Sequence, residues 1–164
     1  MKVNDWIDHH EWAEIYKKLV YWELEIEGTE NKSMAEVLEM QKVEANANFA
    51  RFVAENYSEW LNNQEADRPL MSHQLLANKV FPALNDSPAF LIIIDNLRFD
   101  QWKIIERDIL GYFNLMEETA YYSILPTTTA YARNAIFSGE LPLAMSRKYP
   151  QLWVHDDDSE EGKN

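Results

Sequence analysis

Apolar positions recur every three or four residues through the first part of the chain, which is the spacing of one helix face. Between residues 5 and 27 they are Trp12, Ile15, Leu19, Trp22 and Ile26. Gly28 follows, and glycine is common just past the end of a helix. We therefore predict a helix over residues 5–27 that ends at Gly28.

A second helical stripe reaches about residue 62. Its apolar members are Met34, Leu38, Ala45, Phe49, Phe52, Tyr57, Trp60 and Leu61. Ser33 and Glu36 have the spacing of a capping box, which predicts the start of this helix. A short loop between two such helices indicates an antiparallel hairpin with the tryptophans in its core. Ser72 is expected to cap a short third helix, His73–Phe81, which Pro82 ends.

The pattern changes after the turn-forming residues 85–88. Ala89–Asp95 is a continuous apolar run, typical of a strand buried on both faces in a parallel sheet. A helix with Trp102, Ile105 and Ile109 follows and is closed by Gly111. Thr119–Leu125 predicts a second strand, and Thr129 opens a helix over Ala130–Ser138 that Gly139 ends.

The predicted architecture is therefore an all-α helical hairpin or bundle (residues 1–85) followed by an α/β domain (residues 86–164). Two strands do not make a stable parallel sheet, so we interpret the second domain as an incomplete, truncated one.

Composition narrows the classes of function. The net charge is −13 and the chain has no cysteine. An acidic chain argues against broad nucleic-acid binding, and the missing thiols exclude disulfides, iron–sulfur clusters and cysteine nucleophiles. The first residues lack the apolar core of a signal peptide, and the longest apolar run is too short to cross a bilayer. We expect a soluble cytoplasmic protein without membrane contact.

Asp95 and Thr129 follow the two predicted strands, where ligands bind in open α/β sheets. The helix after Thr129 would direct backbone N–H groups at a phosphate. Lowering an alcohol's pKa from that of water to neutrality requires about 12 kcal/mol, whereas a helix N-terminus supplies at most about 2 kcal/mol. A nucleophilic Thr129 therefore needs a base or a metal, and Asp95 is a suitable oxygen ligand.

Each of these residues also has a purely structural interpretation. By composition alone, Asp95 is more simply explained as a cap or turn former, and threonines before a helix are more commonly caps than catalytic residues. Asp100 is either a second ligand or the N-cap of the Trp102 helix. Arg133 and Asn134, one turn beyond Thr129, are candidate substrate-binding residues, although a solvated surface arginine is an alternative.

Two other clusters have the composition of metal sites. Asp8, His9, His10 and Glu11 are more simply explained as an exposed face of the first helix. His155 with Asp156–Asp158 gives an equally weak signal for metal binding.

Two segments in order carry a family resemblance. "FLIIIDNLRFDQW" (Phe90–Trp102) and "SILPTTTAYARNAIFSG" (Ser123–Gly139) resemble the opening of PglZ domains, members of the alkaline phosphatase superfamily. The helical segments "EWAEIYKKLVYWELEIE" and "VLEMQKVEANANFARF" resemble the region before that domain in PorX-type bacterial response regulators.

The resemblance implies two divalent metal ions, usually zinc, and a serine or threonine that takes up the phosphoryl group. Asp95 matches a metal ligand, and Thr129 matches the nucleophile, which also contacts metal; Thr127 and Thr128 are then turn and capping residues. The remaining ligands lie in the second half of such domains, so this chain is expected to bind metal incompletely and to have little activity.

The family further implies a phosphodiester substrate, with linear or cyclic oligonucleotides as candidates, an upstream receiver domain, and regulation of type IX secretion. Two functions remain open from the sequence. One is metal-dependent phosphodiester hydrolysis, and the other is a non-catalytic signalling module that acts or homodimerises through the helical hairpin.

Overall fold

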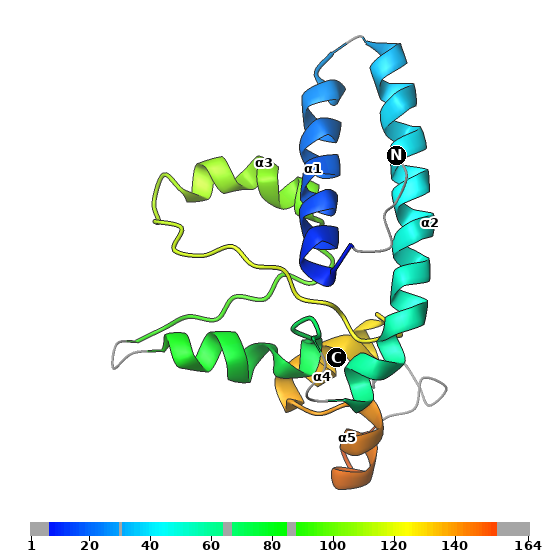
Figure 1. Ribbon diagram of the computed structural model, residues 1–164. Helices are drawn as coiled ribbons and strands as arrows, with labels where there is room; N and C mark the ends of the chain where they lie inside the picture. Colours follow the sequence, from blue (N-terminus) through cyan, green and yellow to red (C-terminus); the bar gives the residue numbers. More distant parts are fainter. Residues whose placement is uncertain (1–6, 30, 64–66, 85–87, 154–164) are drawn as a thin grey trace. The chain divides into compact units, whose positions relative to one another are not determined.

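The computed structural model describes residues 7–29, 31–63, 67–84 and 88–153, and these residues form two compact units (Figure 1). Unit 1 comprises the described residues of Met1–Arg68 together with Ile93–Glu118. Unit 2 comprises the described residues of Pro69–Ile92 and Thr119–Asn164. The first unit therefore takes in a stretch of chain from the middle of the sequence.

The predicted helical hairpin is confirmed in unit 1. Helix α1 (His9–Glu27) and helix α2 (Lys32–Asn62) lie side by side in Figure 1. Near the start of α1, the Trp12 ring contacts the rings of Phe49 and Phe52. Near its end, Glu23 accepts a hydrogen bond from Lys42 Nζ at 2.6 Å. Since positions late in α1 contact positions early in α2, the two helices are antiparallel.

Side-chain caps start both helices of the hairpin. Asp8 and Glu11 form a reciprocal capping box, so two members of the candidate metal cluster have a structural role. His9 is buried rather than on an exposed face, and burial lowers the pKa of its imidazole. For α2, the predicted capping box at Ser33 is wrong. Asn31 is the N-cap, and its side-chain oxygen accepts from the Met34 N–H at 3.2 Å.

The tryptophan stripe is only partly core. Trp12 and Trp60 are 6% and 3% exposed, whereas Trp22 is 49% exposed. Trp22 is wrongly placed in the core by the heptad-like spacing, because α1 buries Trp12 and Val20, two turns apart, on the side that faces α2. Helical periodicity identifies an apolar stripe but does not say how much of it a partner helix covers.

This difference predicts unequal effects of two matched substitutions. Trp12→Ala should lower the free energy of unfolding by about 3–5 kcal/mol, because it leaves a cavity beside two aromatic rings of α2. Trp22→Ala on the same helix should cost no more than about 1 kcal/mol. Urea unfolding followed by circular dichroism measures both values, and equal losses would contradict the packing described here.

The third helix of unit 1 is α3 (Phe99–Ile109), which confirms the helix predicted around Trp102, Ile105 and Ile109. Its last residue lies two positions before Gly111, where the helix was predicted to end. It contacts α1, so its partner is the hairpin. The predicted N-cap Asp100 is wrong: Arg98 occupies that position and Asp100 lies inside the first turn.

Unit 2 contains short helical turns and two helices. The short third helix predicted over His73–Phe81 is replaced by 3-10 and π turns, η1 (Ser72–Gln74), η2 (Leu76–Val80) and η3 (Phe81–Ala83). Helix α4 (Thr129–Ser138) confirms the predicted helix after the threonines, and α5 (Pro142–Lys148) was not predicted.

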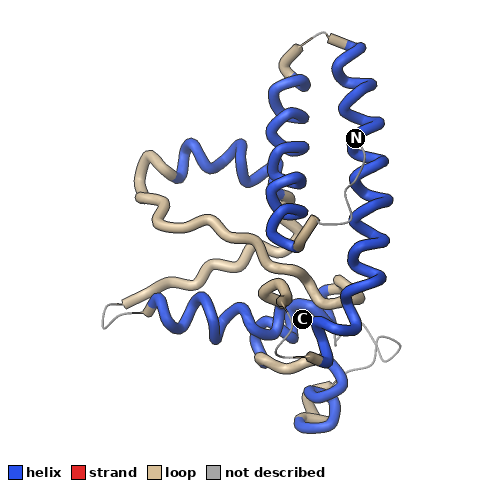
Figure 2. Tube along the Cα trace, viewed as in Figure 1, coloured by secondary structure: helices blue, strands red, loops and turns tan. Residues whose placement is uncertain are grey.

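The described residues contain no β-strand, so the predicted parallel sheet is not formed in them (Figure 2). Residues 89–94 lack regular secondary structure, and Phe90 is 93% exposed. Within Thr119–Leu125, Tyr122 makes a single parallel bridge with Met71. An apolar run favours a strand, but a strand also needs neighbours that pair with its N–H and C=O groups. In the described residues, such pairing is found only between Tyr122 and Met71.

None of the helices in these described ranges combines the length and apolar character needed to span a bilayer. The predicted division into domains at residues 85 and 86 stays a prediction, since the compact units follow spatial contact rather than chain order.

Candidate functional site

Thr129 is the first residue of α4, and its side chain is exposed. Thr128 occupies the N-cap position in an extended conformation but makes no side-chain capping hydrogen bond. Its carbonyl accepts from the N–H groups of Tyr131 and Ala132 at 3.0 and 2.9 Å. The capping role expected of Thr128 is therefore carried by its backbone rather than by its hydroxyl.

The chain that leads into the threonines is fixed by a buried contact with the segment before η1. Tyr122 N–H donates to the Leu70 carbonyl at 2.8 Å, and Ser72 N–H donates to the Tyr122 carbonyl at 3.2 Å. Ser72 Oγ accepts from the Ile124 N–H at 3.1 Å, and Ser72 and Ile124 are 0% and 1% exposed. Ser72 is thus a positioning residue for the turn before Thr129 rather than a helix cap. No local pattern in the sequence indicates this pairing across fifty-two positions.

Helix α4 is anchored on its other side by an apolar stripe. Ala132, Ala135 and Ile136 are buried, and α4 contacts η1. Arg133 lies four residues after Thr129, so the two share one side of the helix, and Arg133 is half-buried. Asn134 donates from Nδ2 to the Ala130 carbonyl at 2.7 Å, which directs one amide hydrogen to its own helix. The substrate-binding roles of Arg133 and Asn134 stay predictions.

Gly139 ends α4 in the left-handed region with φ 68°, and its N–H donates to the Ala135 carbonyl at 3.0 Å. A side chain there is strained, because Cβ crowds the backbone in this conformation. Gly139→Ala should therefore destabilise the protein by about 1 kcal/mol.

Gly28 provides a matched control at the end of α1. Its φ is −79° and nothing lies within 4 Å of an added Cβ. Gly28→Ala should be neutral or stabilise by up to about 1 kcal/mol, because it only restricts the unfolded chain. Urea unfolding of both variants checks the pair, and a Gly139→Ala protein as stable as the wild type would contradict the left-handed cap.

Asp95 lies in unit 1, in a turn before α3, and its side chain is exposed. The next residue, Asn96, has φ 62°, a left-handed conformation that asparagine tolerates better than most residues. This turn connects the apolar run, residues 89–94, to α3. Asp95 belongs to unit 1 and Thr129 to unit 2.

Asp100, the second candidate ligand, is engaged by Arg98. The Arg98 guanidinium donates to both carboxylate oxygens, from Nε at 3.0 Å and from Nη2 at 2.7 Å. Hydrogen bonding to Arg98 lowers the pKa of Asp100 and raises that of Arg98. A carboxylate held in this bidentate way must break a charge-assisted contact before it ligates a metal.

The described residues do not by themselves form the metal centre that the sequence implies. Within them no group of three or more His, Cys, Asp and Glu side chains is placed to hold a metal ion. Asp95 and Thr129, the two predicted metal-site residues, belong to separate units. The second weak cluster, His155 with Asp156–Asp158, lies outside the described residues.

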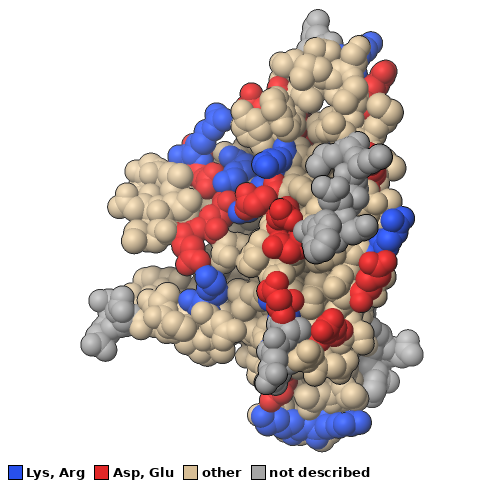
Figure 3. All heavy atoms as spheres, in the orientation of Figure 1, with Lys and Arg blue, Asp and Glu red and all other residues tan. Residues whose placement is uncertain are grey.

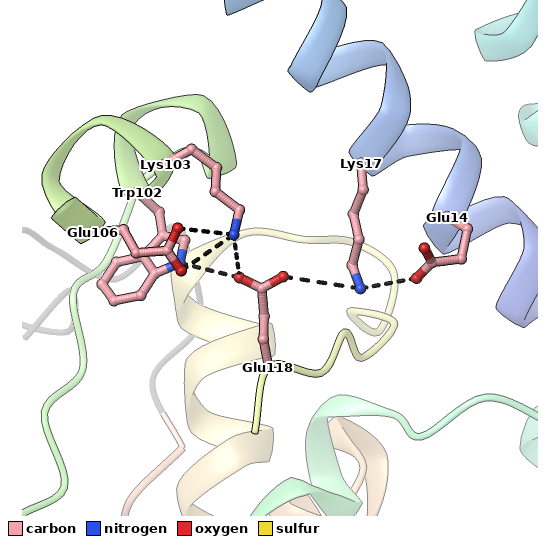
Figure 4. Close-up of polar contacts among 6 residues, drawn as sticks. All are labelled: Glu14, Lys17, Trp102, Lys103, Glu106 and Glu118. Atoms are coloured by element: carbon pink, nitrogen blue, oxygen red, sulfur yellow. Dashed lines mark hydrogen bonds and ion pairs between the residues drawn. The ribbon is translucent and has the colours of Figure 1, made fainter. Parts of the chain in front are cut away.

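A polar network that the sequence did not reveal joins α1 to α3 (Figure 4). Glu118 accepts from Lys103 Nζ at 2.7 Å and from Trp102 Nε1 at 3.3 Å, and Lys17 Nζ lies 4.0 Å from its other oxygen. Burial opposes ionisation of Glu118, but its hydrogen bonds and the nearby lysine charges outweigh burial and lower its pKa. Acidic and basic side chains accordingly gather where α1 and α3 lie in Figure 3.

Comparisons with known proteins divide the chain by sequence order, whereas unit 1 includes residues from both matches. Residues 75–164, more than half of the chain, match the family described as the BREX system PglZ alkaline phosphatase-like domain. Residues 1–61 match the PorX response regulator linker domain. A comparison with curated proteins found no match.

The class of protein is thus an alkaline phosphatase-like domain behind a response-regulator linker. The chain belongs to the PglZ family and carries a PorX-type linker ahead of its PglZ region. Thr129, Arg133 and Asp95 all lie inside the PglZ match, and the α1–α2 hairpin lies in the linker.

Proposed function

We propose that this chain belongs to the output region of a bacterial response regulator and that its PglZ domain hydrolyses phosphodiesters with the help of divalent metal. The observation that carries the proposal is the order of the two family matches, a response-regulator linker followed by an alkaline phosphatase-like domain. A receiver domain upstream, oligonucleotide substrates and a place in type IX secretion are further parts of the proposal. So are a cytoplasmic location and zinc as the metal.

Thr129 is the proposed nucleophile. An exposed hydroxyl at the first position of a helix has the backbone N–H groups of that helix nearby, which favour an incoming phosphate. As the Thr129 oxygen bonds to phosphorus, its proton passes to solvent, and the P–O bond to the first alcohol breaks as that oxygen takes a proton from solvent. Water then attacks phosphorus of the phosphothreonine, which breaks the Thr129 O–P bond, releases the phosphomonoester and restores the hydroxyl. Arg133, on the same side of α4, is proposed to contact the phosphate oxygens.

Asp95 is proposed as a metal ligand because carboxylate oxygen suits divalent cations. A bound divalent ion would supply positive charge that lowers the pKa of a coordinated hydroxyl. The parallel sheet of an alkaline phosphatase-like fold is likewise proposed for the strand-like segments Ala89–Asp95 and Thr119–Leu125.

Hydrolysis of bis-p-nitrophenyl phosphate tests the proposal directly. Supplied with zinc, the full-length protein should release nitrophenolate, measured by absorbance, and a chelator should stop the release, whereas the chain of 164 residues should show little activity. Intact substrate after prolonged incubation with zinc would count against an enzyme.

The alternative is a non-catalytic signalling or homodimerisation module. One observation favours it: α2 carries large exposed apolar side chains at Val37, Met40 and Val43, which are 49%, 65% and 62% exposed. Light scattering tests this alternative, because a monomer at micromolar concentration contradicts dimerisation through the hairpin.

A further inference from the structure

Two neighbouring residues of α1, Tyr16 and Lys17, contact two points of one stretch of the PglZ region, residues 93–118. The Tyr16 ring lies 5.9 Å from the Phe99 ring, at the first residue of α3. Lys17 Nζ lies 4.0 Å from Glu118 Oε1, at the end of the same stretch (Figure 4). Phe99 and Glu118 therefore both lie against one turn of α1.

The stretch is also held together internally. Glu118 accepts from Lys103 and Trp102 on α3, and Lys103 Nζ donates as well to Glu106 at 3.0 Å. The Lys103 ammonium lies 5.2 Å from the Phe99 ring centroid, within the range of a cation–π contact. These contacts connect Phe99 and Glu118 to Lys103 on α3. We therefore expect a displacement of Tyr16 and Lys17 to shift α3 as well.

These contacts cross the boundary between the two family matches. Tyr16 and Lys17 lie in the linker match, 1–61, whereas Phe99 and Glu118 lie in the PglZ match, 75–164. Residues 93–118 nevertheless form one compact unit with the hairpin. The linker is thus part of the structural surroundings of the PglZ segment rather than a separate spacer.

Phe99 and Glu118, the residues that contact α1, are close in sequence to the segments that carry the predicted site residues. Asp95 lies four residues before Phe99 in the sequence. Thr119 directly follows Glu118 and begins the segment that leads to Thr129. The local chain paths to both predicted site residues therefore start from points held against α1.

We propose that Tyr16 and Lys17 are positioning residues through which the linker hairpin holds the PglZ segment 93–118, so that a movement of α1 is transmitted to the chain around Asp95. The mechanical coupling stands on the contacts alone. Its regulatory consequence, control of hydrolysis by the linker, rests on the proposed function.

The contact is suited to a reversible coupling. Tyr16 is 53% exposed, and the Lys17–Glu118 pair is partly solvated, so neither contact belongs to the hairpin core of Trp12, Val20 and Trp60. Removing it should loosen α3 without unfolding the hairpin.

Hydrogen exchange measured by mass spectrometry tests the coupling in the full chain. The double variant Tyr16→Ala/Lys17→Met should speed amide exchange in α3 by about fivefold, because the Tyr16–Phe99 ring pair and the Lys17–Glu118 ion pair are lost. The variant also removes the 2.9 Å ion pair between Lys17 and Glu14 within α1. The matched control is Tyr21→Ala/Lys18→Met on the same helix. Tyr21 is 55% exposed and contacts Trp22, and the control changes the charge equally. It should leave α3 exchange at the wild-type rate.

Tyr16→Phe provides the rescue, since it keeps the ring that contacts Phe99 and should retain full protection of α3. Equal exchange of α3 in the wild type and the test variant would overturn the proposal. Equal acceleration by the test and control variants would also overturn it. If the test variant loses the hairpin's circular dichroism signal, Tyr16→Ala alone replaces it, with Tyr21→Ala as control and the same expectations.

The regulatory arm uses the phosphodiesterase assay on the same proteins. If the linker controls hydrolysis, the test variant should change kcat by more than about threefold, whereas the control variant and Tyr16→Phe stay at the wild-type value. A wild-type protein without hydrolysis refutes the proposed function, while the exchange data still decide the coupling. Unchanged kcat together with faster α3 exchange refutes the regulatory consequence only.

Discussion

In the full-length protein, replacing Thr129 by valine is expected to abolish phosphodiester hydrolysis, with kcat falling by about a thousandfold or more. Removal of a nucleophile costs several orders of magnitude in enzymes that form a covalent intermediate. Valine keeps the branched shape of threonine and removes the hydroxyl alone. Since Thr129 is exposed and its neighbour holds the N-cap position, the free energy of unfolding should change by less than about 0.5 kcal/mol.

Thr128→Val is the matched control for this result. Thr128 is adjacent, exposed and makes no side-chain capping hydrogen bond, so its valine variant should keep kcat within about threefold of the wild type. Thr129→Ser should retain measurable activity because it keeps a hydroxyl. Nitrophenolate release under saturating substrate measures all three, and a Thr129→Val protein with wild-type turnover removes Thr129 as the nucleophile.

Replacing Asp95 by asparagine is expected to lower metal binding by about a hundredfold or more. Outer-shell partners of metal ligands already change affinity by about 10–100-fold, and a direct ligand contributes at least as much. Asparagine keeps the size of the side chain and removes its charge. Elemental analysis after dialysis against micromolar zinc gives the bound metal per chain.

Asp108→Asn is the control, because Asp108 is an exposed carboxylate on α3 in the same unit. It should bind as much metal as the wild type. Equal metal in the Asp95→Asn protein and the wild type would exclude Asp95 from the ligands, and so would a wild-type chain that retains none. Loss of metal in both variants would indicate a general effect of acidic charge.

Helix positions were largely predictable from the sequence because their determinants are local. The α1 stripe and Gly28 predicted the end of the first helix, and Gly139 predicted the end of α4. The capping residues were less predictable. Ser33 and Asn31 both have side chains that cap helices, and the chain used the earlier one. For α3, the guanidinium of Arg98 drew Asp100 into an ion pair in place of a cap.

Strand pairing was not predictable, because it depends on partners elsewhere in the chain. Ala89–Asp95 has the composition of a buried strand but lies exposed without regular structure, whereas Tyr122 pairs with Met71. The supports of the candidate site were missed for the same reason. Ser72 accepts a hydrogen bond from Ile124, and Glu118 pairs with Lys17 and Lys103. No short sequence pattern around either residue predicts these contacts.

The sequence by itself determined the approximate positions of α1, α2, α3 and α4, the ends of α1 and α4, the family of the chain, and the two candidate residues Asp95 and Thr129. These features depend on residue types at short spacings, where propensity, capping and motif chemistry act. Only the tertiary structure decided that residues 93–118 join the linker hairpin and that Ser72 holds the approach to Thr129. Contacts between distant residues depend on which surfaces are buried together, and that follows from the packing of the whole unit.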